Sequence, residues 1–189
     1  MKRITSVGIV LAVALVLGSC GGNSTLDDSE AAVYITVEIE EYNPDIDVCS
    51  YIEFGADIDI ETMNVVSTAK APGATLSSSQ DVNITRWVIT PERNDGGSTA
   101  SPQAIFDQGV FVTAGGTADL SNWRVYPVEY LSEVPLGYLL PQNGGVDPET
   151  GARNIRQRLV LQMFGETISG KSVASTPVPI QFNFFCGTP

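Results

Sequence analysis

Residues 155–186 read IRQRLVLQMFGETISGKSVASTPVPIQFNFFC, and this stretch decides the fold. Every second residue of its first half forms one face: Ile155, Gln157, Leu159, Leu161 and Met163. Its second half repeats the spacing with Val178, Ile180, Phe182 and Phe184. Alternation with period two is typical of a strand with one buried face, and residues 165–171 supply a turn with glycines. The stretch therefore predicts a β-hairpin.

A helix over residues 152–163 is the competing prediction, because Ile155, Leu159 and Met163 also fit a period of four. We favour the hairpin because a second amphipathic segment follows at once. Upstream, residues 33–39 alternate in the same way. A second strand is expected to place on one face Ile52, Phe54, Ala56, Ile58 and Ile60.

The remaining segments complete the expected set of strands. Residues 63–70 and 82–91 are strand candidates. Residues 101–103 could cap a short helix that reaches Gln108 and stops at Gly109, and residues 105–112 fit a strand equally well. Residues 123–140 are rich in aromatic and β-branched side chains but contain two prolines, which limit them to edge or irregular strand.

About eight strands at this spacing predict an all-β fold, a two-sheet antiparallel β-sandwich, as one domain over residues 32–189. The closing hairpin resembles the last two strands of immunoglobulin-like and fibronectin-like modules. The resemblance covers about the last 40 residues and implies an immunoglobulin-like or related sandwich of the kind found in many surface proteins.

The first twenty residues contain the parts of an export signal in their usual order. Lys2 and Arg3 are followed by an apolar run over residues 7–17, which is too short to span a membrane as a helix of about 20 residues. Leu17-Gly18-Ser19-Cys20 comes next, and here the sequence resembles the lipobox of bacterial lipoproteins. An uncleaved anchor helix and an ordinary signal peptide with a chance cysteine are the alternatives.

The resemblance to lipoproteins implies a signal peptide over residues 1–19 and a diacylglycerol on the Cys20 thiol, with a further acyl chain such as palmitate on the new amino group. Several acyl chains anchor a protein stably, at about 0.8 kcal/mol for each buried methylene. Residues 20–31 then form the lipidated cysteine and a short flexible tether. Gly21 stands where an Asp would imply inner-membrane retention, so outer-membrane sorting is favoured if the organism has two membranes.

The net charge of the body limits which kinds of partner are expected. Removal of Lys2 and Arg3 with the leader leaves 8 basic against 22 acidic side chains, a formal charge of −14. Such a surface repels phosphate backbones, so nucleic acid is not an expected partner, and it also repels anionic headgroups. We therefore expect the lipid on Cys20 to hold the body at its membrane. The chain has no histidine, which removes the usual general base and the usual zinc ligand.

Two cysteines remain once Cys20 carries lipid. Leftover thiols in an exported protein usually pair, so Cys49 and Cys186 are expected to form a disulfide. A redox pair or a metal site is the alternative, but the chain has no Cys-x-x-Cys spacing to support it.

Carboxylates are the abundant functional groups. Asp57, Asp59 and Glu61 stand two residues apart, and Asp45 and Asp47 repeat that spacing. Together with loop acids in residues 94–97 and 147–149, they could supply the six to eight oxygens that calcium takes. We favour a solvated acidic strand face instead and expect no metal or other cofactor.

Aromatic side chains offer a second possible binding surface: Trp87, Trp123, Tyr126, Tyr130 and Tyr138. They could line a face for sugar or protein, but such residues more often fill a sandwich core. The expected function is that of a lipid-anchored, non-catalytic envelope protein with a structural or protein-binding role. A calcium- or carbohydrate-binding module is the alternative, and a carboxylate-dependent hydrolase is the least favoured class.

Overall fold

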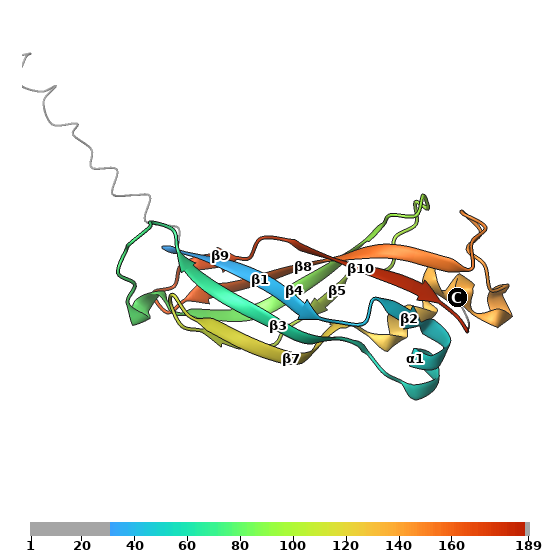
Figure 1. Ribbon diagram of the computed structural model, residues 1–189, viewed down its shortest axis with the longest axis horizontal. Coiled ribbons are helices and arrows are strands. Elements are labelled where there is room, and N and C mark those ends of the chain that lie inside the picture. Colours follow the sequence, from blue (N-terminus) through green and yellow to red (C-terminus); the bar gives the residue numbers. More distant parts are fainter. Residues whose placement is uncertain (1–30, 188–189) are drawn as a thin grey trace, which may run out of the picture.

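Two β-sheets packed together form the body of the computed structural model, which describes residues 31–187 (Figure 1). The predicted all-β sandwich is confirmed. The signal peptide, Cys20 and most of the tether lie outside the described residues.

The small sheet has three strands in the order β1-β3-β7: β1 (Val33–Glu41), β3 (Ile58–Ala69) and β7 (Thr117–Tyr126). The large sheet has the order β2-β10-β8-β4-β5, with β6 also on β4 and β9 also on β8. Its strands are β2 (Asp45–Asp47), β4 (Val82–Arg93), β5 (Ala104–Phe106), β6 (Val110–Val112), β8 (Asn154–Thr167), β9 (Ser172–Ala174) and β10 (Val178–Phe185). The helices are α1 (Val48–Phe54) and the short 3-10 helices η2 (Ser78–Gln80), η3 (Val128–Ser132), η4 (Leu136–Leu139) and η5 (Pro141–Asn143).

The closing hairpin forms as predicted, between β8 and β10. The two strands are antiparallel, with Ile180 opposite Leu159, and the expected face of β8 is buried. Gln157 lies in that face and donates a hydrogen bond from Nε2 to Ser101 Oγ at 2.8 Å. The competing helix over residues 152–163 is therefore wrong. The return strand begins with β9, which already pairs with β8, so the turn is confined to residues 168–171.

Strand pairing is antiparallel throughout the described sheets except between β2 and β10, which run parallel. The chain leaves the small sheet after β1 and enters the large sheet at β2. The start of the body is thereby tied to both sheets.

The predicted strand over residues 52–60 is wrong in its first half, where the chain forms α1. The Asp47 carboxylate caps this helix by accepting hydrogen bonds from the backbone N–H groups of Cys49 and Ser50. Gly55 ends it in the left-handed conformation. Satisfied backbone groups at both ends stabilise a helix that the apolar spacing alone does not predict.

The expected separate strand over residues 63–70 is instead the second half of β3. Ile60 and Met63 are both buried, so the inward face changes from even to odd positions within one strand. The partner strand β7 changes phase at the same level, where Asn122 has a φ of 49°. The two changes compensate each other, and the pairing continues through them.

Two open predictions are now decided. Residues 101–112 form the strands β5 and β6, not a capped helix. Residues 123–140 finish β7 and then turn into η3 and η4, each preceded by a proline, Pro127 and Pro135. The predicted edge strand is present over residues 123–126, at the end of β7, but the prediction of strand is wrong beyond Pro127, where the chain is helical.

The aromatic side chains mainly fill the core between the sheets. Trp87 packs against Trp123 with ring centroids 4.6 Å apart and stacks on Phe106 at 5.3 Å. Trp87, Trp123 and Tyr126 are buried, and burial raises the pKa of the Tyr126 hydroxyl, which donates to the Pro102 carbonyl at 3.1 Å. The preferred interpretation of these residues as core is confirmed for these three.

Candidate functional site

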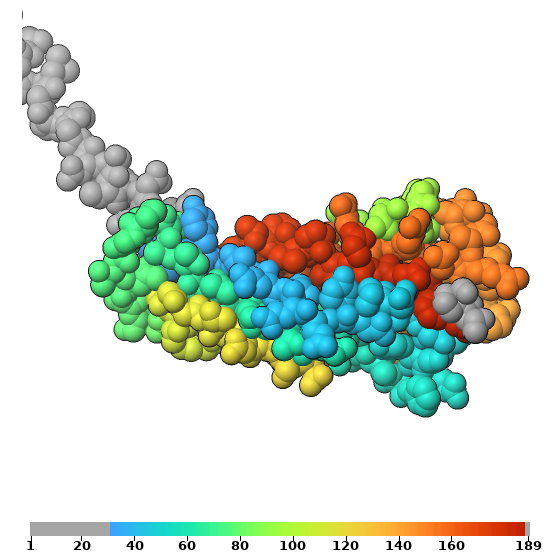
Figure 2. Space-filling model, in the orientation of Figure 1, coloured from blue at the N-terminus to red at the C-terminus, as the bar shows by residue number. Residues whose placement is uncertain are grey.

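Most of the irregular segments gather at one end of the elongated sandwich, whereas residues 70–81 with η2 lie at the other end (Figure 1). We call the first of these the far end; it holds α1, η3–η5, the loops 94–103 and 144–153, and Gly187. The near end, opposite, holds the start of the described chain at Ala31 and the β8–β9 turn. In Figure 2 the teal residues of α1 protrude at the far end.

A buried arginine holds two loops of the far end together. Only 2% of the Arg93 side chain is exposed, against 8% for Asp95 and 0% for Asp147. Arg93 Nε and one terminal nitrogen donate to the two carboxylate oxygens of Asp95 at 2.8 and 2.9 Å. The same terminal nitrogen donates to Asp147 Oδ2 at 2.8 Å. The guanidinium is therefore shared between acids 52 residues apart in the sequence.

Each of the two aspartates collects further donors. Asp95 accepts from the backbone N–H of Gly97 at 3.1 Å and of Arg156 at 2.9 Å. Asp147 accepts from the Thr150 hydroxyl at 2.7 Å. Burial acts to raise the pKa of both carboxyls, but these hydrogen bonds and Arg93 outweigh it and hold each pKa below its usual value.

A third carboxylate extends the connection between the two loops. Glu149 accepts hydrogen bonds from Ser98 and Thr99, through their backbone N–H groups and their hydroxyls. These bonds lower the pKa of Glu149. Loop acids that the sequence suggested as calcium ligands are thus engaged by a guanidinium, hydroxyls and backbone N–H groups. No local sequence signal links Arg93 to Asp147, because the loops meet only in the folded sandwich.

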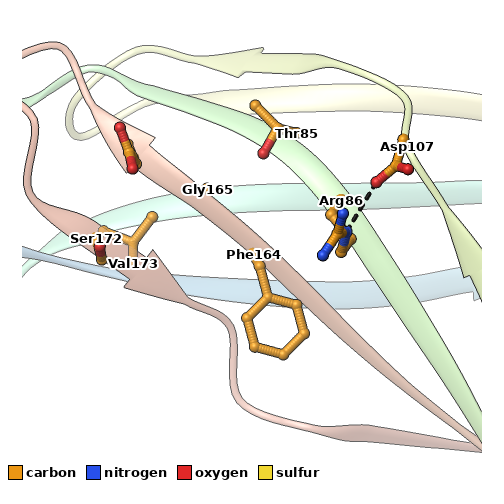
Figure 3. Close-up of a pocket in the computed structure, with 8 residues that line it drawn as sticks. Thr85, Arg86, Asp107, Phe164, Gly165, Ser172 and Val173 are labelled. Atoms are coloured by element: carbon orange, nitrogen blue, oxygen red, sulfur yellow. Dashed lines mark hydrogen bonds and ion pairs between the residues drawn. The ribbon is translucent and has the colours of Figure 1, made fainter.

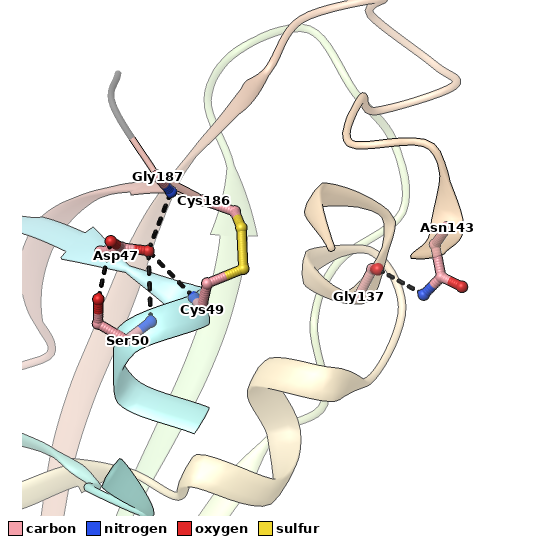
Figure 4. The surroundings of a disulfide bond; sticks show 7 residues. All are labelled: Asp47, Cys49, Ser50, Gly137, Asn143, Cys186 and Gly187. Atoms are coloured by element: carbon pink, nitrogen blue, oxygen red, sulfur yellow. Dashed lines mark hydrogen bonds between the residues drawn. A yellow bond between two sulfur atoms is a disulfide. The ribbon is translucent and has the colours of Figure 1, made fainter. Parts of the chain in front are cut away.

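The disulfide closes the other side of the far end (Figure 4). Cys49 in α1 and Cys186 after β10 are bonded, with their Cα atoms 5.1 Å apart, which is consistent with the predicted pairing. Asp47 accepts from the backbone N–H of Gly187 at 3.2 Å and from the Ser50 hydroxyl at 2.9 Å. Burial acts to raise the Asp47 pKa, but these bonds and the cap of α1 hold it below its usual value.

The acids considered as possible metal ligands are dispersed. In residues 31–187, the one group of three potential ligands whose atoms lie within 4.8 Å is Asp47, Cys49 and Cys186, and its sulfurs are bonded to each other. Asp57 instead accepts from Arg124 at 3.0 Å and from a backbone N–H.

Asp59 and Glu61 lie exposed on the outer side of β3. Burial and the nearby Asp57 carboxylate raise the pKa of Asp59, although Arg124 opposes them. The three acids therefore resemble the solvated strand face that we favoured, with Asp57 drawn into an ion pair.

The far end also exposes apolar side chains. Phe54, at the end of α1, is 80% exposed, and Val134 and Val146 are exposed in the segments around η3–η5. Tyr130 and Tyr138, the two remaining aromatic candidates, are half-buried there. The far end thus combines a cross-linked, ion-paired frame with single apolar side chains exposed to solvent.

Comparison of the chain with protein-family models, with curated proteins and with solved structures gave no match. Within residues 31–187, no helix has the length and apolar character needed to cross a membrane.

Proposed function

We propose that this protein is a lipid-anchored, non-catalytic component of a bacterial cell envelope, which binds an envelope protein through its far end. The anchor is the diacylglycerol on Cys20, with the outer membrane favoured in a diderm organism. The body belongs, in this proposal, with the immunoglobulin-like and related surface modules.

The position of the far end carries the proposal. The body begins at Ala31, at the near end, so a tether that leads from the membrane holds that end closest to it. The far end then points away from the membrane, toward other envelope components. Its loops are held by a disulfide and a buried ion network, so a partner would meet a surface ordered in advance.

Charge supports the same arrangement. The body without its leader carries a formal charge of −14, so anionic headgroups repel it and it would leave a membrane without an anchor. Lipid on Cys20 would keep it there, whereas the exposed Phe54 on the far end offers a partner an apolar contact.

Replacing Cys20 with Ala is expected to move the protein from the membrane fraction to the soluble fraction, because the acyl chains are lost. Each buried methylene contributes about 0.8 kcal/mol to anchoring. The measurement is fractionation of cells followed by immunoblotting. Ser24→Ala, in the tether, is the matched control and should stay with the membrane. A Cys20→Ala protein that remains membrane-bound would contradict the proposed anchor.

A photo-crosslinking amino acid at Phe54 is expected to capture a discrete envelope protein in intact cells, because Phe54 is the most exposed large apolar side chain among the described residues. The same group at Ile168 is the control, since Ile168 is 62% exposed but lies in the near-end turn. Mass spectrometry identifies the adducts. Adducts at Ile168 but none at Phe54 would overturn the assignment of the partner surface to the far end.

A further inference from the structure

The outer surface of the large sheet carries a cleft of about 560 Å³ (Figure 3). It includes residues of β8 and β9 beside the near-end turn, away from the far end (Figure 1). Its volume lies within the range of about 300–1,000 Å³ found for small-molecule sites. Polar and aromatic side chains line it: Thr85, Arg86, Asp107, Phe164, Glu166 and Ser172.

A β-bulge in β4 creates one wall of the cleft. Ile84 and Trp87 are both buried, so the two residues between them, Thr85 and Arg86, both lie on the outer surface. The pairing with β8 shifts by one residue at this point, where Thr85 has no partner. Bulges redirect side chains in this way and are frequent beside binding sites.

A glycine in β8 lets this strand approach β4 closely beside the cleft. A Cβ on Gly165 would come within 2.2 Å of the Asn83 carbonyl oxygen and 2.7 Å of the Ile84 Cα, so β8 can carry no side chain here. Phe164, next to it, is half-buried beside the cleft. A glycine in a strand interior at a bulge marks a close approach of two backbones.

The polar groups of the cleft are only partly used within the protein. Arg86 Nε donates to Asp107 Oδ1 at 2.7 Å, which leaves both terminal nitrogens of the guanidinium as donors for a ligand. In the described part of the chain, the Glu166 carboxylate and the Thr85 and Ser172 hydroxyls make no side-chain hydrogen bond. Hydrogen-bond donors and acceptors thus line the cleft together with the Phe164 side chain.

We infer that this cleft binds a neutral saccharide. A cationic ligand would meet the Arg86 guanidinium, and an anion would meet the carboxylates of Asp107 and Glu166. A pyranose has hydroxyls that both donate and accept, and its C–H face can pack on the Phe164 ring. This mixture matches the lining of the cleft, and the inference does not depend on the anchor or on the far end.

The test uses the full chain, purified from the fraction that holds it, in a detergent without sugar. Screening on an array of neutral and acidic glycans is followed by calorimetric titration with maltohexaose, cellohexaose and chitohexaose. Inorganic phosphate and tri-arginine are titrated in parallel. We expect at least one neutral glycan to bind, with affinity reduced about tenfold or more by Phe164→Ala and by Arg86→Ala.

Two further variants keep the result interpretable. Glu166→Gln, an isosteric change of an exposed side chain, should weaken binding without changing the thermal midpoint, even if Phe164→Ala impairs folding. Phe54→Ala is the control and should bind glycan as the unaltered protein does. The inference is overturned if no glycan binds, if binding is insensitive to Phe164, Arg86 and Glu166, or if phosphate or tri-arginine binds more tightly.

Discussion

Replacing Arg93 with Met is expected to lower the free energy of unfolding at pH 7 by about 3–5 kcal/mol, because removing one partner of a buried ion network leaves charges without compensation. Asp147 is fully buried and Asp95 nearly so, and each would lose its guanidinium contact. Urea unfolding followed by tryptophan fluorescence measures the change.

The loss of stability in Arg93→Met should become smaller at lower pH, for the following reason. In the unaltered protein the pKa values of Asp95 and Asp147 lie below the usual value. Their stabilising contribution is therefore present above the unfolded-state pKa of about 3.9 and disappears as the pH falls through the lower folded-state values. Loss of Arg93 removes a group that lowers both pKa values, while burial still acts to raise them, so we expect each folded-state pKa to rise and protonation to favour the folded variant. The deficit of Arg93→Met should then shrink as the pH falls from 7 to 5.

A matched control separates the effect of losing a buried arginine from the effect of losing one positive charge. Arg124→Met removes a cation that pairs with Asp57 on the surface, where about half of the arginine side chain is exposed. Exposed ion pairs contribute about 1 kcal/mol or less, so this variant should lose little stability at either pH. An Arg93→Met protein as stable as Arg124→Met, or a deficit that grows toward pH 5, would contradict the role given to the buried network.

Replacing both Cys49 and Cys186 with Ser is expected to destabilise the body by about 2–5 kcal/mol, because the cross-link restricts the unfolded chain. The bonded residues are 137 positions apart, so the closed loop includes almost the whole domain. Equilibrium unfolding with and without reductant measures the effect, and hydrogen exchange should show the largest local increase in α1 and after β10.

The control for the disulfide is chemical. Reductant should lower the stability of the unaltered protein to the level of the double-serine variant and leave that variant unchanged. Cys20→Ser should behave as the unaltered protein does, since Cys20 takes no part in the bond. Equal stability of the double-serine and unaltered proteins would show that the cross-link contributes nothing to the fold.

The alternation of apolar and polar residues predicted strands best where one face of the strand stays buried along its length. The alternation runs unbroken through residues 33–39 of β1 and along β8, and both strands were expected. β3 and β4 each change phase once, at residues 61–62 and 85–86, where two outward residues stand together between buried ones. Such a pair of consecutive polar residues is a readable sign of a phase change, and in β4 it would have pointed to the cleft.

The helix α1 shows why alternation can mislead. Its apolar residues fit a strand, but the cap at Asp47 and the left-handed Gly55 stabilise a helix over only seven residues. Capping depends on the side chains just outside the segment, whereas period two is read from the segment itself. In so short an element, the two ends decide the conformation.

The sequence by itself determined the fold class, because burial of every second side chain is a local property that the chain displays directly. It also singled out Cys49 and Cys186, since the cysteines are few. Only the tertiary structure decided that Arg93 lies between Asp95 and Asp147, and that Thr85 and Phe164 face one cleft. These groups are far apart in the chain, and their energies depend on distance and burial, which exist only after the sheets have packed.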